Sequence, residues 1–453
     1  MGKYFGTDGY RGEAGVELTA YRAFRTGRYL GHYLKQIKDK DSKRPKVAIG
    51  KDTRLSSYML EYAIASGLAA SGADVYILHV TTTPSVSYIT GIDGFDAGIM
   101  ITASHNPYYD NGIKIIDSKG EKLSDGVARL IEAYIDEECE EIPESVGDEI
   151  GRIHDHYSGR NRYIGYLISL ASSSYKGLKI GIDAANGAAF AISRSVFSAL
   201  GAEIYAIADE PNGLNVNSSC GSTHPEKLCS LVKENGLDIG FAFDGDADRC
   251  IAVDSRGNIV DGDKIMYLLA RRFKRLGMLA NDTVVATVMS NLGFIKSAKR
   301  MGIDVETTQV GDRFVYARMQ ELGAMLGGEQ SGHIIIKKYA TTGDGILTAI
   351  MICEELIDTK TSLAELTKSV ALLPQVNKSV RVKDKKACLS DPELKSLTEC
   401  IADEIKDCGR LLIRESGTEP KVRIMLEAEN EEMCIFYINK IIKLLSDKGY
   451  LYE

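Results

Sequence analysis

Short, almost continuous hydrophobic runs recur along the first three quarters of the chain, and a helical stretch follows each of them. Each helical stretch ends in a glycine, which suits the left-handed conformation in which helices commonly end, and leads into a second β-rich run. The hydrophobic runs and their closing glycines are Lys46–Gly50 with Gly72, Leu178–Asp183 with Gly201, and Thr283–Val288 with Gly302. Apolar runs joined through helices are typical of parallel strands covered on both faces. This pattern predicts three similar, mixed and mainly parallel α/β domains around a cleft.

The chain after about residue 370 has a different pattern. Lysine-rich turns separate two short strands at Arg410–Arg414 and Val422–Glu427, and a long helix is expected near Glu431–Ser446. This composition predicts a smaller C-terminal α+β domain. The expected domains are residues 1–152, 153–255, 256–370 and 371–453.

Each of the four domains contains one unusual polar loop directly after a strand. The loops are Thr102–Pro107, Asp244–Arg249, Glu329–His333 and Arg414–Pro420. In open parallel sheets, ligands bind outside the carboxyl ends of the strands. We therefore expect the loops of the first three domains to face one cleft and the C-terminal domain to add the fourth.

The loop of the second domain places Asp244, Asp246 and Asp248 at alternate positions. Carboxylates this close repel one another unless a cation neutralises them, and Mg²⁺ is a natural partner for such oxygen ligands. An EF-hand does not fit, because Arg249 and Ser255 stand where that loop needs Gly and Glu. A solvated acidic turn is the alternative.

The loop of the first domain contains Ser104 between small and polar residues, with Lys114 shortly after it. It could be a polar turn whose side chains cap the local backbone. A hydrolase serine is disfavoured because no G-x-S-x-G surrounds it. In a site with Mg²⁺, the hydroxyl could instead carry a transferable phosphoryl group, with Lys114 as a nearby cation or as an ordinary strand residue.

The remaining two loops offer groups that suit a phosphosugar. Arg414–Pro420 combines a guanidinium, two hydroxyls and a glycine, which can enclose a phosphate, and Arg423 could add a second guanidinium. Glu329–His333 offers a carboxylate, an amide and a hydroxyl for sugar groups, and His333 could move a proton. Taken alone, each can also be a structural loop.

Composition and charge narrow the classes of partner. The 453 residues include 55 Lys and Arg and 63 Asp and Glu, a net charge of −8, which argues against a broad nucleic-acid-binding face. The hydrophobic fraction of 44% and the charged fraction of 26% are ordinary for globular proteins. No apolar run approaches the roughly 18–20 residues that a membrane span needs. We expect a small anionic substrate, no nucleic acid and no membrane.

The cysteines and the N-terminal segment both suit a cytoplasmic location. The nine cysteines are scattered, odd in number and form no C-x-x-C, which suits reduced thiols. The first twelve residues, MGKYFGTDGYRG, lack the basic and apolar segments of a signal peptide. A monomer and a homodimer both remain open.

Taken together, the four loops resemble the motifs of the α-D-phosphohexomutase superfamily. Its TASHNP, DGDADR, GE-x-SGH and SGTEP motifs occur in the expected order and span the chain. The branch that acts on an amino-sugar phosphate is matched further at Lys3–Gly9, Arg11, Ser290–Gly293, Val310–Arg313 and Thr341–Gly345. Mannose- and glucose-phosphate branches typically carry Gly-His at Gly311-Asp312 and Met at Gln330, and this chain has neither.

The resemblance implies a role for each matching residue. Ser104 would be the phosphoserine, and one Mg²⁺ per active site would bind its phosphate together with Asp244, Asp246 and Asp248. The residues implied around the transferring phosphoryl group are Arg11, His105, Lys114 and Arg249. His333, Lys114 or another residue would be the general acid or base. The residues implied in binding the sugar and its second phosphate are Glu329, Ser331, Arg414, Ser416, Gly417, Thr418 and Arg423.

The activity implied is the interconversion of glucosamine 6-phosphate and glucosamine 1-phosphate. It would pass through phospho-Ser104 and a sugar 1,6-bisphosphate, which could also act as an activator, and it would supply UDP-N-acetylglucosamine for cell-wall synthesis. A mutase for mannose or glucose phosphates is the alternative within the superfamily. A non-catalytic phosphosugar-binding protein is the alternative outside it.

Overall fold

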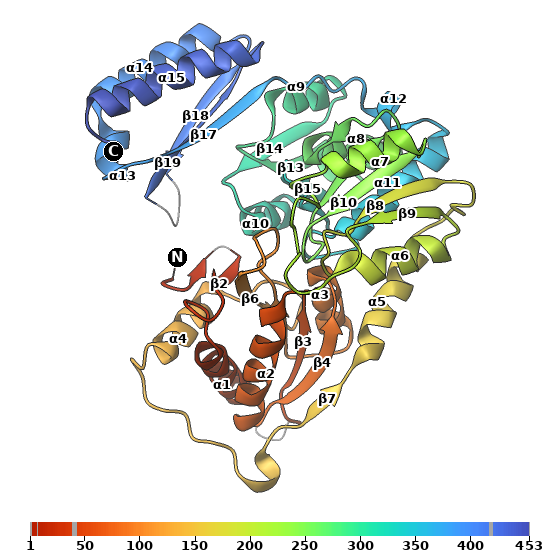
Figure 1. Ribbon diagram of the computed structural model, residues 1–453, viewed down its shortest axis with the longest axis vertical. Helices are drawn as coiled ribbons and strands as arrows, with labels where there is room; N and C mark the ends of the chain where they lie inside the picture. Colours follow the sequence, from red (N-terminus) through yellow and green to blue (C-terminus); the bar gives the residue numbers. More distant parts are fainter. Residues whose placement is uncertain (1, 7, 39–42, 416–419, 453) are drawn as a thin grey trace. The chain divides into compact units, whose positions relative to one another are not determined.

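The computed structural model describes residues 2–6, 8–38, 43–415 and 420–452 (Figure 1). These residues form two compact units. The first unit comprises residues 1–289 and 303–368, and the second comprises residues 290–302 and 369–453. The first unit contains three β-sheets and the second contains one.

The three sheets of the first unit repeat one arrangement of four strands. In each, the first strand lies parallel to the second and the third, and the fourth runs antiparallel to the third. The strand orders are β4-β3-β5-β6 within residues 46–117, β9-β8-β10-β11 within residues 179–254 and β14-β13-β15-β16 within residues 283–336. The prediction of three similar, mixed and mainly parallel domains is confirmed. The polar loops predicted from the sequence join the third strand to the fourth in all three sheets.

The first sheet has seven strands, because two short strands extend one edge and another extends the opposite edge. The strands are β1 (Phe5–Gly6), β2 (Gly9–Glu13), β3 (Lys46–Lys51), β4 (Asp74–Val80), β5 (Ala97–Ile101), β6 (Asp110–Asp117) and β7 (Ile153–Asp155). The helices are α1 (Ala20–Ile37), α2 (Leu55–Ala70), α3 (Thr83–Ile92), α4 (Asp125–Ile135) and the 3₁₀ turn η1 (Gly147–Glu149). Strand β7 pairs with β4, so this sheet continues just beyond residue 152, the predicted end of the first domain.

Alternation along strand β3 explains why helices cover both faces of the first sheet. Successive side chains of a strand point to opposite faces. Val47 and Ile49 belong to the core under α1, α2 and α4, whereas Ala48 belongs to the core under α3. A strand that is apolar at every position therefore needs helices on both faces, as the sequence pattern predicted.

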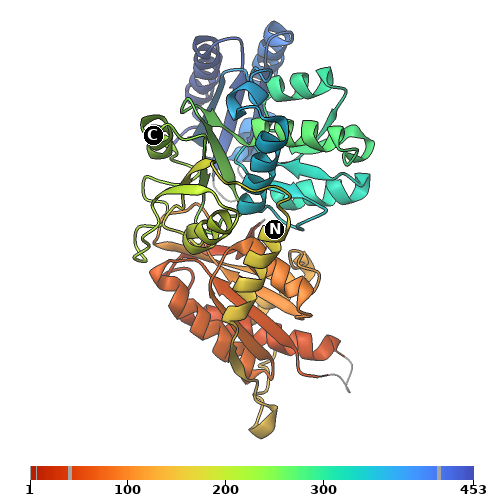
Figure 2. The same ribbon diagram turned by 90° about the vertical axis from the view of Figure 1, so that its right-hand side faces the viewer.

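The second and third sheets follow the same plan with fewer strands. The second sheet contains β8 (Lys179–Asp183), β9 (Glu203–Ile207), β10 (Ile239–Phe243), β11 (Cys250–Asp254) and β12 (Ile259–Val260). The third contains β13 (Thr283–Thr287), β14 (Asp304–Thr308), β15 (Leu326–Gly328) and β16 (Ile334–Ile336). The helices and the 3₁₀ turn η2 in this region are α5 (Tyr157–Ser169), α6 (Ala189–Ala199), α7 (Glu226–Glu234), α8 (Gly262–Arg275), η2 (Ala280–Asp282), α10 (Asp312–Leu322), α11 (Gly345–Thr359) and α12 (Leu363–Thr367). Helix α5 links the first two domains by packing against both α3 and α6 (Figure 2).

The second unit is built on an antiparallel sheet, as expected for the C-terminal α+β domain. Its strands are β17 (Gln375–Arg381), β18 (Arg410–Glu415) and β19 (Lys421–Glu427), in the order β17-β19-β18. Its helices are α9 (Leu292–Arg300), α13 (Lys385–Ser390), α14 (Pro392–Ile405) and α15 (Glu431–Asp447). Helices α14 and α15 share one buried core with this sheet. Among the described helices of the whole chain, none is long and apolar enough to cross a membrane.

Candidate active site

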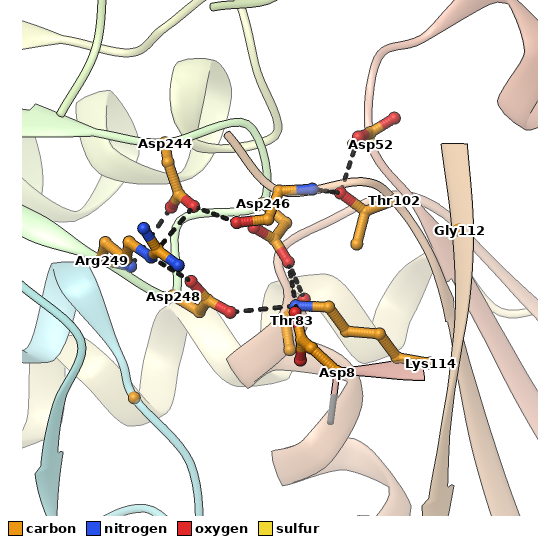
Figure 3. Close-up of polar contacts among 12 residues, drawn as sticks. Asp8, Asp52, Thr83, Thr102, Gly112, Lys114, Asp244, Asp246, Asp248 and Arg249 are labelled. Carbon is orange, nitrogen blue, oxygen red and sulfur yellow. Dashed lines mark hydrogen bonds and ion pairs between the residues drawn. The ribbon is translucent and has the colours of Figure 1, made fainter. Parts of the chain in front are cut away.

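Three buried carboxylates lie together in the loop between β10 and β11. Alternate spacing brings the side chains of Asp244, Asp246 and Asp248 to within 4.8 Å of one another, measured between potential ligand atoms (Figure 3). Among the described residues, Oδ1 of Asp246 and Oδ1 of Asp248 have no hydrogen-bond donor although both atoms are buried. Buried charged oxygens without donors are costly unless a cation compensates them. The site therefore fits a hard divalent cation such as Mg²⁺.

The electrostatics of the three carboxylates differ. Burial, followed by repulsion from Asp248 and Asp246, raises the pKa of Asp244 well above its usual value. Burial would also raise the pKa of Asp248, but Lys114, His333 and Arg249 more than offset it and hold that pKa well below the usual value. The negative charge of Asp244 is thus less compensated by protein groups than that of Asp248, which again favours a bound cation.

Ser104 lies directly beside this loop, although it comes from a different domain. It is buried, and its hydroxyl donates to Oδ2 of Asp244 at 2.6 Å. Its backbone has a positive φ of 52°, which serine seldom adopts, and its N–H donates to Oγ1 of Thr102 at 2.9 Å. Nδ1 of His105 is 3.4 Å from Oγ of Ser104. The turn therefore directs the hydroxyl toward the carboxylate cluster.

The buried guanidinium of Arg54 supports the serine loop through hydrogen bonds to its backbone. Arg54 donates to the backbone oxygens of Ser104 (3.0 Å) and Asn106 (2.8 Å), and Asp52 accepts from its Nε at 2.8 Å. Asn217 of the second domain donates to the same two backbone oxygens. Sequence reasoning missed these groups. The polar run Asp52–Arg54 directly after the buried strand β3 was the available signal for Arg54, and none pointed to Asn217.

Lys114 on β6 connects the first domain to the carboxylate cluster. Its Nζ lies 2.8 Å from Oδ2 of Asp246, 3.0 Å from Oδ2 of Asp248 and 3.3 Å from Oδ2 of Asp8. Burial would lower its pKa, but these three carboxylates raise it well above the usual value. Thr83, at the start of α3, donates its hydroxyl to Asp246 at 2.5 Å. Lys114 is therefore a fixed ammonium group beside the candidate metal ligands.

Arg249, Arg11 and His105 lie around the same centre. Nε of Arg249 is 3.9 Å from a carboxylate oxygen of Asp244 and equally far from one of Asp248. Arg11 on β2 pairs with Asp8. Burial, with Arg249 and Arg11 nearby, lowers the pKa of His105 to about 3, so its ring is neutral near pH 7. The centre thus has two guanidinium groups that can meet an anion.

The loop between β15 and β16 brings His333 to the same cluster. Its Nδ1 lies 3.6 Å from Oδ1 of Asp248, and its Nε2 accepts from the N–H of Gly343 at 3.0 Å. Burial lowers the pKa of His333, but Asp248, Asp312 and Glu329 raise it to about 9. The contact with Gly343 instead favours a neutral ring with Nε2 free of a proton. Both forms carry a proton on Nδ1, facing Asp248.

Glu329 and Ser331 precede His333 in this loop. Oε1 of Glu329 accepts from the N–H of Gly311 at 3.0 Å, at the start of α10. Gly311 has a φ of 131°, which only glycine adopts easily, so this turn and the orientation of Glu329 depend on each other. The hydroxyl of Ser331 is buried and has no hydrogen-bond partner among the described residues, so it can accept a ligand contact.

The C-terminal unit contains the predicted phosphate-binding arginines. Arg414 on β18 is the direct cross-strand partner of Arg423 on β19. Two like charges placed opposite each other repel, and an anion between them would relieve that repulsion. Glu415 is on the opposite face of the sheet, with Oε2 3.9 Å from Nζ of Lys385. The predicted ligands Ser416, Gly417 and Thr418 lie outside the described residues.

Comparison with known proteins agrees with this architecture. Models of phosphoglucomutase/phosphomannomutase α/β/α domains I, II and III match residues 2–141, 161–257 and 261–372, and the C-terminal domain model matches residues 378–433. The phosphoglucosamine mutase of Lachnoclostridium phytofermentans is 52% identical over 451 residues, which cover 100% of both chains.

Solved structures share the fold at lower sequence identity. A phosphoglucomutase/phosphomannomutase family protein from Burkholderia thailandensis aligns with a TM-score of 0.80 and 24% identity, covering 99% of this chain and 98% of that one. Aspergillus fumigatus N-acetylphosphoglucosamine mutase, solved in complex with GlcNAc-6P and magnesium, aligns with a TM-score of 0.65 and 17% identity over 98% of this chain and 96% of that one.

The four domain matches, in this order, define the class as the phosphoglucomutase/phosphomannomutase, or α-D-phosphohexomutase, superfamily. Within that class, the chain is about half identical over its full length to phosphoglucosamine mutases, whereas the two solved structures described above are 24% and 17% identical. The chain belongs to the phosphoglucosamine mutase family, and it is an isomerase of the intramolecular phosphotransferase type.

Proposed function

We propose that the protein interconverts glucosamine 6-phosphate and glucosamine 1-phosphate. The identity of 52% to a phosphoglucosamine mutase over the full length supports this choice of substrate. The product would supply UDP-N-acetylglucosamine for cell-wall synthesis, in the cytoplasm. The four domains would be residues 1–152, 153–255, 256–370 and 371–453. The proposed binding partner is a small phosphosugar, with no nucleic acid and no membrane.

The observation that carries the proposal is the contact between Ser104 and the three-aspartate loop. A hydroxyl that lies 2.6 Å from Asp244 is positioned to exchange a phosphoryl group beside a cation held by the same carboxylate. In the proposed reaction, phospho-Ser104 donates its phosphoryl group to the substrate and forms a sugar 1,6-bisphosphate. The sugar then turns around, and its other phosphate returns to Ser104. Added 1,6-bisphosphate should phosphorylate Ser104 and act as an activator.

The cationic residues would bind the transferring group. Mg²⁺, bound by Asp244, Asp246, Asp248 and the phosphate of Ser104, would neutralise charge on the phosphoryl oxygens. Lys114, Arg11 and Arg249 would bind those oxygens from the other sides. Because its carboxylate partners keep Lys114 protonated, we assign it a binding role rather than that of a base. His105, which is neutral, would orient the Ser104 hydroxyl.

The remaining site residues would hold and turn the sugar. Glu329, fixed by the N–H of Gly311, and Ser331, with its unpartnered hydroxyl, suit the sugar hydroxyls. His333 would transfer a proton at the reacting oxygen from its protonated Nδ1. The non-transferring phosphate would bind to Arg414, Arg423 and the loop residues Ser416, Gly417 and Thr418. This site must accept either end of the intermediate, so it needs charge more than shape.

A side-by-side assay of the 1-phosphates of glucosamine, glucose and mannose tests the proposal. We expect kcat/KM for glucosamine 1-phosphate to exceed that for glucose 1-phosphate by at least about tenfold, equivalent to ~1.4 kcal/mol of transition-state binding. Mannose 1-phosphate, with its C2 substituent inverted, should be poorer. Equal or better turnover of a hexose phosphate would make the protein a hexose-phosphate mutase. Binding without turnover of any of the three would make it a phosphosugar-binding protein.

A further inference from the structure

Six ionisable groups, alternately acidic and basic, form a closed ring beside the candidate active site. Each is within ion-pair distance of the next, and the last contacts the first. We call this set the ionic ring, and its members in order are Asp8, Lys114, Asp248, His333, Asp312 and Lys122.

The ring joins all three domains of the first unit. Asp8, Lys114 and Lys122 come from the first domain, Asp248 from the second, and the remaining two members from the third. One half of the ring consists of the contacts of Lys114 and His333 with Asp248, at 3.0 and 3.6 Å. This half belongs to the candidate active site.

The other half of the ring depends on Lys122. Its Nζ lies 2.8 Å from Oδ1 of Asp8 and 2.6 Å from Oδ2 of Asp312. Asp8 continues to Lys114 at 3.3 Å, and Asp312 lies 3.4 Å from Nε2 of His333, a contact that is an ion pair when Nε2 is protonated. Lys122 is therefore two contacts away from each of the two groups that reach Asp248.

Removing the ammonium group of Lys122 would leave Asp8 with Arg11 and Lys114, and Asp312 with His333, but would remove the cation that contacts both carboxylates. Two carboxylates that contact the same ammonium group lie close enough to repel each other, so Asp8 and Asp312 would move apart. Asp312 is the first residue of α10, and Asp8 immediately precedes β2. Their movement would displace Lys114 and His333 relative to Asp248. A displacement of about 1 Å in a reacting assembly can cost roughly a hundredfold in rate.

We propose that Lys122 is a positioning residue of the mutase reaction, which holds Lys114 and His333 at their distances on either side of Asp248. This inference rests on the proposed function, because it assigns Lys122 to that reaction. A direct contact of Lys122 with the sugar phosphate is the competing explanation, since Lys122 also borders a pocket of about 250 Å³ together with Lys114 and Asp312.

The test compares Lys122→Met with Lys122→Arg and with a control variant, in the full-length protein with Mg²⁺ and glucosamine 1-phosphate. Asp125→Asn is the matched control, because Asp125 and Arg313 form a 3.0 Å ion pair between the same two segments but outside the ring. We expect Lys122→Met to lower kcat at least about tenfold while KM changes less than about threefold. Lys122→Arg should recover most of the loss, and Asp125→Asn should stay within about twofold of wild type.

A second variant keeps the test decisive if Lys122→Met folds poorly. Asp312→Asn removes one of the two carboxylates that Lys122 separates, so the double variant Lys122→Met/Asp312→Asn relieves their repulsion. We expect the double variant to lose no more kcat than Lys122→Met alone, because both act through one contact. A loss of kcat in the double variant equal to the product of the losses in the two single variants contradicts the inference.

The outcomes separate this inference from the proposed function. A rise in KM with unchanged kcat in Lys122→Met makes Lys122 a substrate contact, and unchanged kinetics leave the ring without a catalytic role. Either result overturns the inference while the mutase stands. A wild-type protein that turns over no phosphosugar overturns the proposed function, and the inference falls with it.

Discussion

The aspartate centre and the C-terminal arginine pair are both proposed to bind anions, but they are built in opposite ways. At the centre, Ser104, Lys114 and the three carboxylates are buried and fixed by contacts from several domains. In the C-terminal sheet, Arg414 and Arg423 lie directly opposite each other on two paired strands, and Arg423 is exposed. One region fixes atoms in place, whereas the other offers positive charge.

This difference follows from what each region would do. Group transfer requires the donor, the acceptor and the cations to be aligned, so burial and compensating charges are worth their desolvation cost. Holding a phosphate that arrives in two orientations requires charge and tolerance of small displacements. We therefore expect substitutions in the buried centre to lower kcat, and those in the arginine pair to raise KM.

The largest expected effect is that of Ser104→Ala. Loss of the nucleophile should lower turnover at least about a thousandfold, because no other described hydroxyl donates to Asp244. Mass spectrometry of the purified wild type should find part of the protein phosphorylated at Ser104. Ser195→Ala, on the exposed side of α6, is the control and should retain activity. Full activity of Ser104→Ala would exclude the phosphoserine mechanism.

The next effect concerns the metal ligands. Asp246→Asn should lower kcat about a hundredfold or more, because losing one carboxylate charge weakens binding of the cation that would neutralise the phosphoryl oxygens. Treatment with EDTA should abolish activity and added Mg²⁺ should restore it. Asp209→Asn, which breaks an ion pair with Arg194 near the surface, should change little. Retention of the full rate after EDTA treatment would show that the cluster binds no essential cation.

A smaller and kinetically different effect is expected at the arginine pair. Arg414→Ala and Arg423→Ala should each raise KM roughly ten- to a hundredfold for every phosphosugar alike, since a charge-assisted hydrogen bond is worth about 1.5–3 kcal/mol. Initial rates over a range of glucosamine and glucose 1-phosphate concentrations measure this. If kcat falls instead and KM is unchanged, the contrast between the two regions is wrong.

The smallest effect concerns the unfolding temperature, which should change in opposite directions when Asp244 and Asp248 of the same loop are substituted. In EDTA near pH 7, Asp244→Asn should raise the unfolding temperature, because the pKa of Asp244 is raised and its ionisation opposes folding. Each kcal/mol of repulsion removed is worth roughly 1 °C in a chain of 453 residues, because the entropy of unfolding grows with chain length. Asp248→Asn should lower the unfolding temperature, because Lys114 and His333 stabilise that charge. Calorimetry would contradict this if both variants shifted in the same direction.

Adding Mg²⁺ should reverse the first of these shifts. A ligand that binds only the folded state stabilises it by mass action, and wild type should gain more than Asp244→Asn. The same measurement with and without Mg²⁺ therefore reports the metal site without any assay of turnover.

The sequence predicted the individual site loops, but not the side chains that hold these loops in place. The alternate aspartates, the TASHNP serine and the glycine-closed helices are local patterns, and the aspartates and the serine stand in loops between the third and fourth strands of their sheets. The buried Arg54 that holds the serine loop and the Lys122 that separates Asp8 and Asp312 were not found. Their partners are far away in the sequence, so no local pattern marks them.

The sequence by itself determined the three repeated α/β domains, the different C-terminal domain and the family, because hydrophobic period, helix-ending glycines and motif order are all properties of neighbouring residues. Only the tertiary structure decided that the fourth strand of each sheet runs antiparallel and that Ser104 meets Asp244 across a domain boundary. It also decided that six ionisable groups close into a ring. Such contacts depend on which sheet edges and loops come together when apolar faces are buried, and charges distant in sequence become neighbours only then.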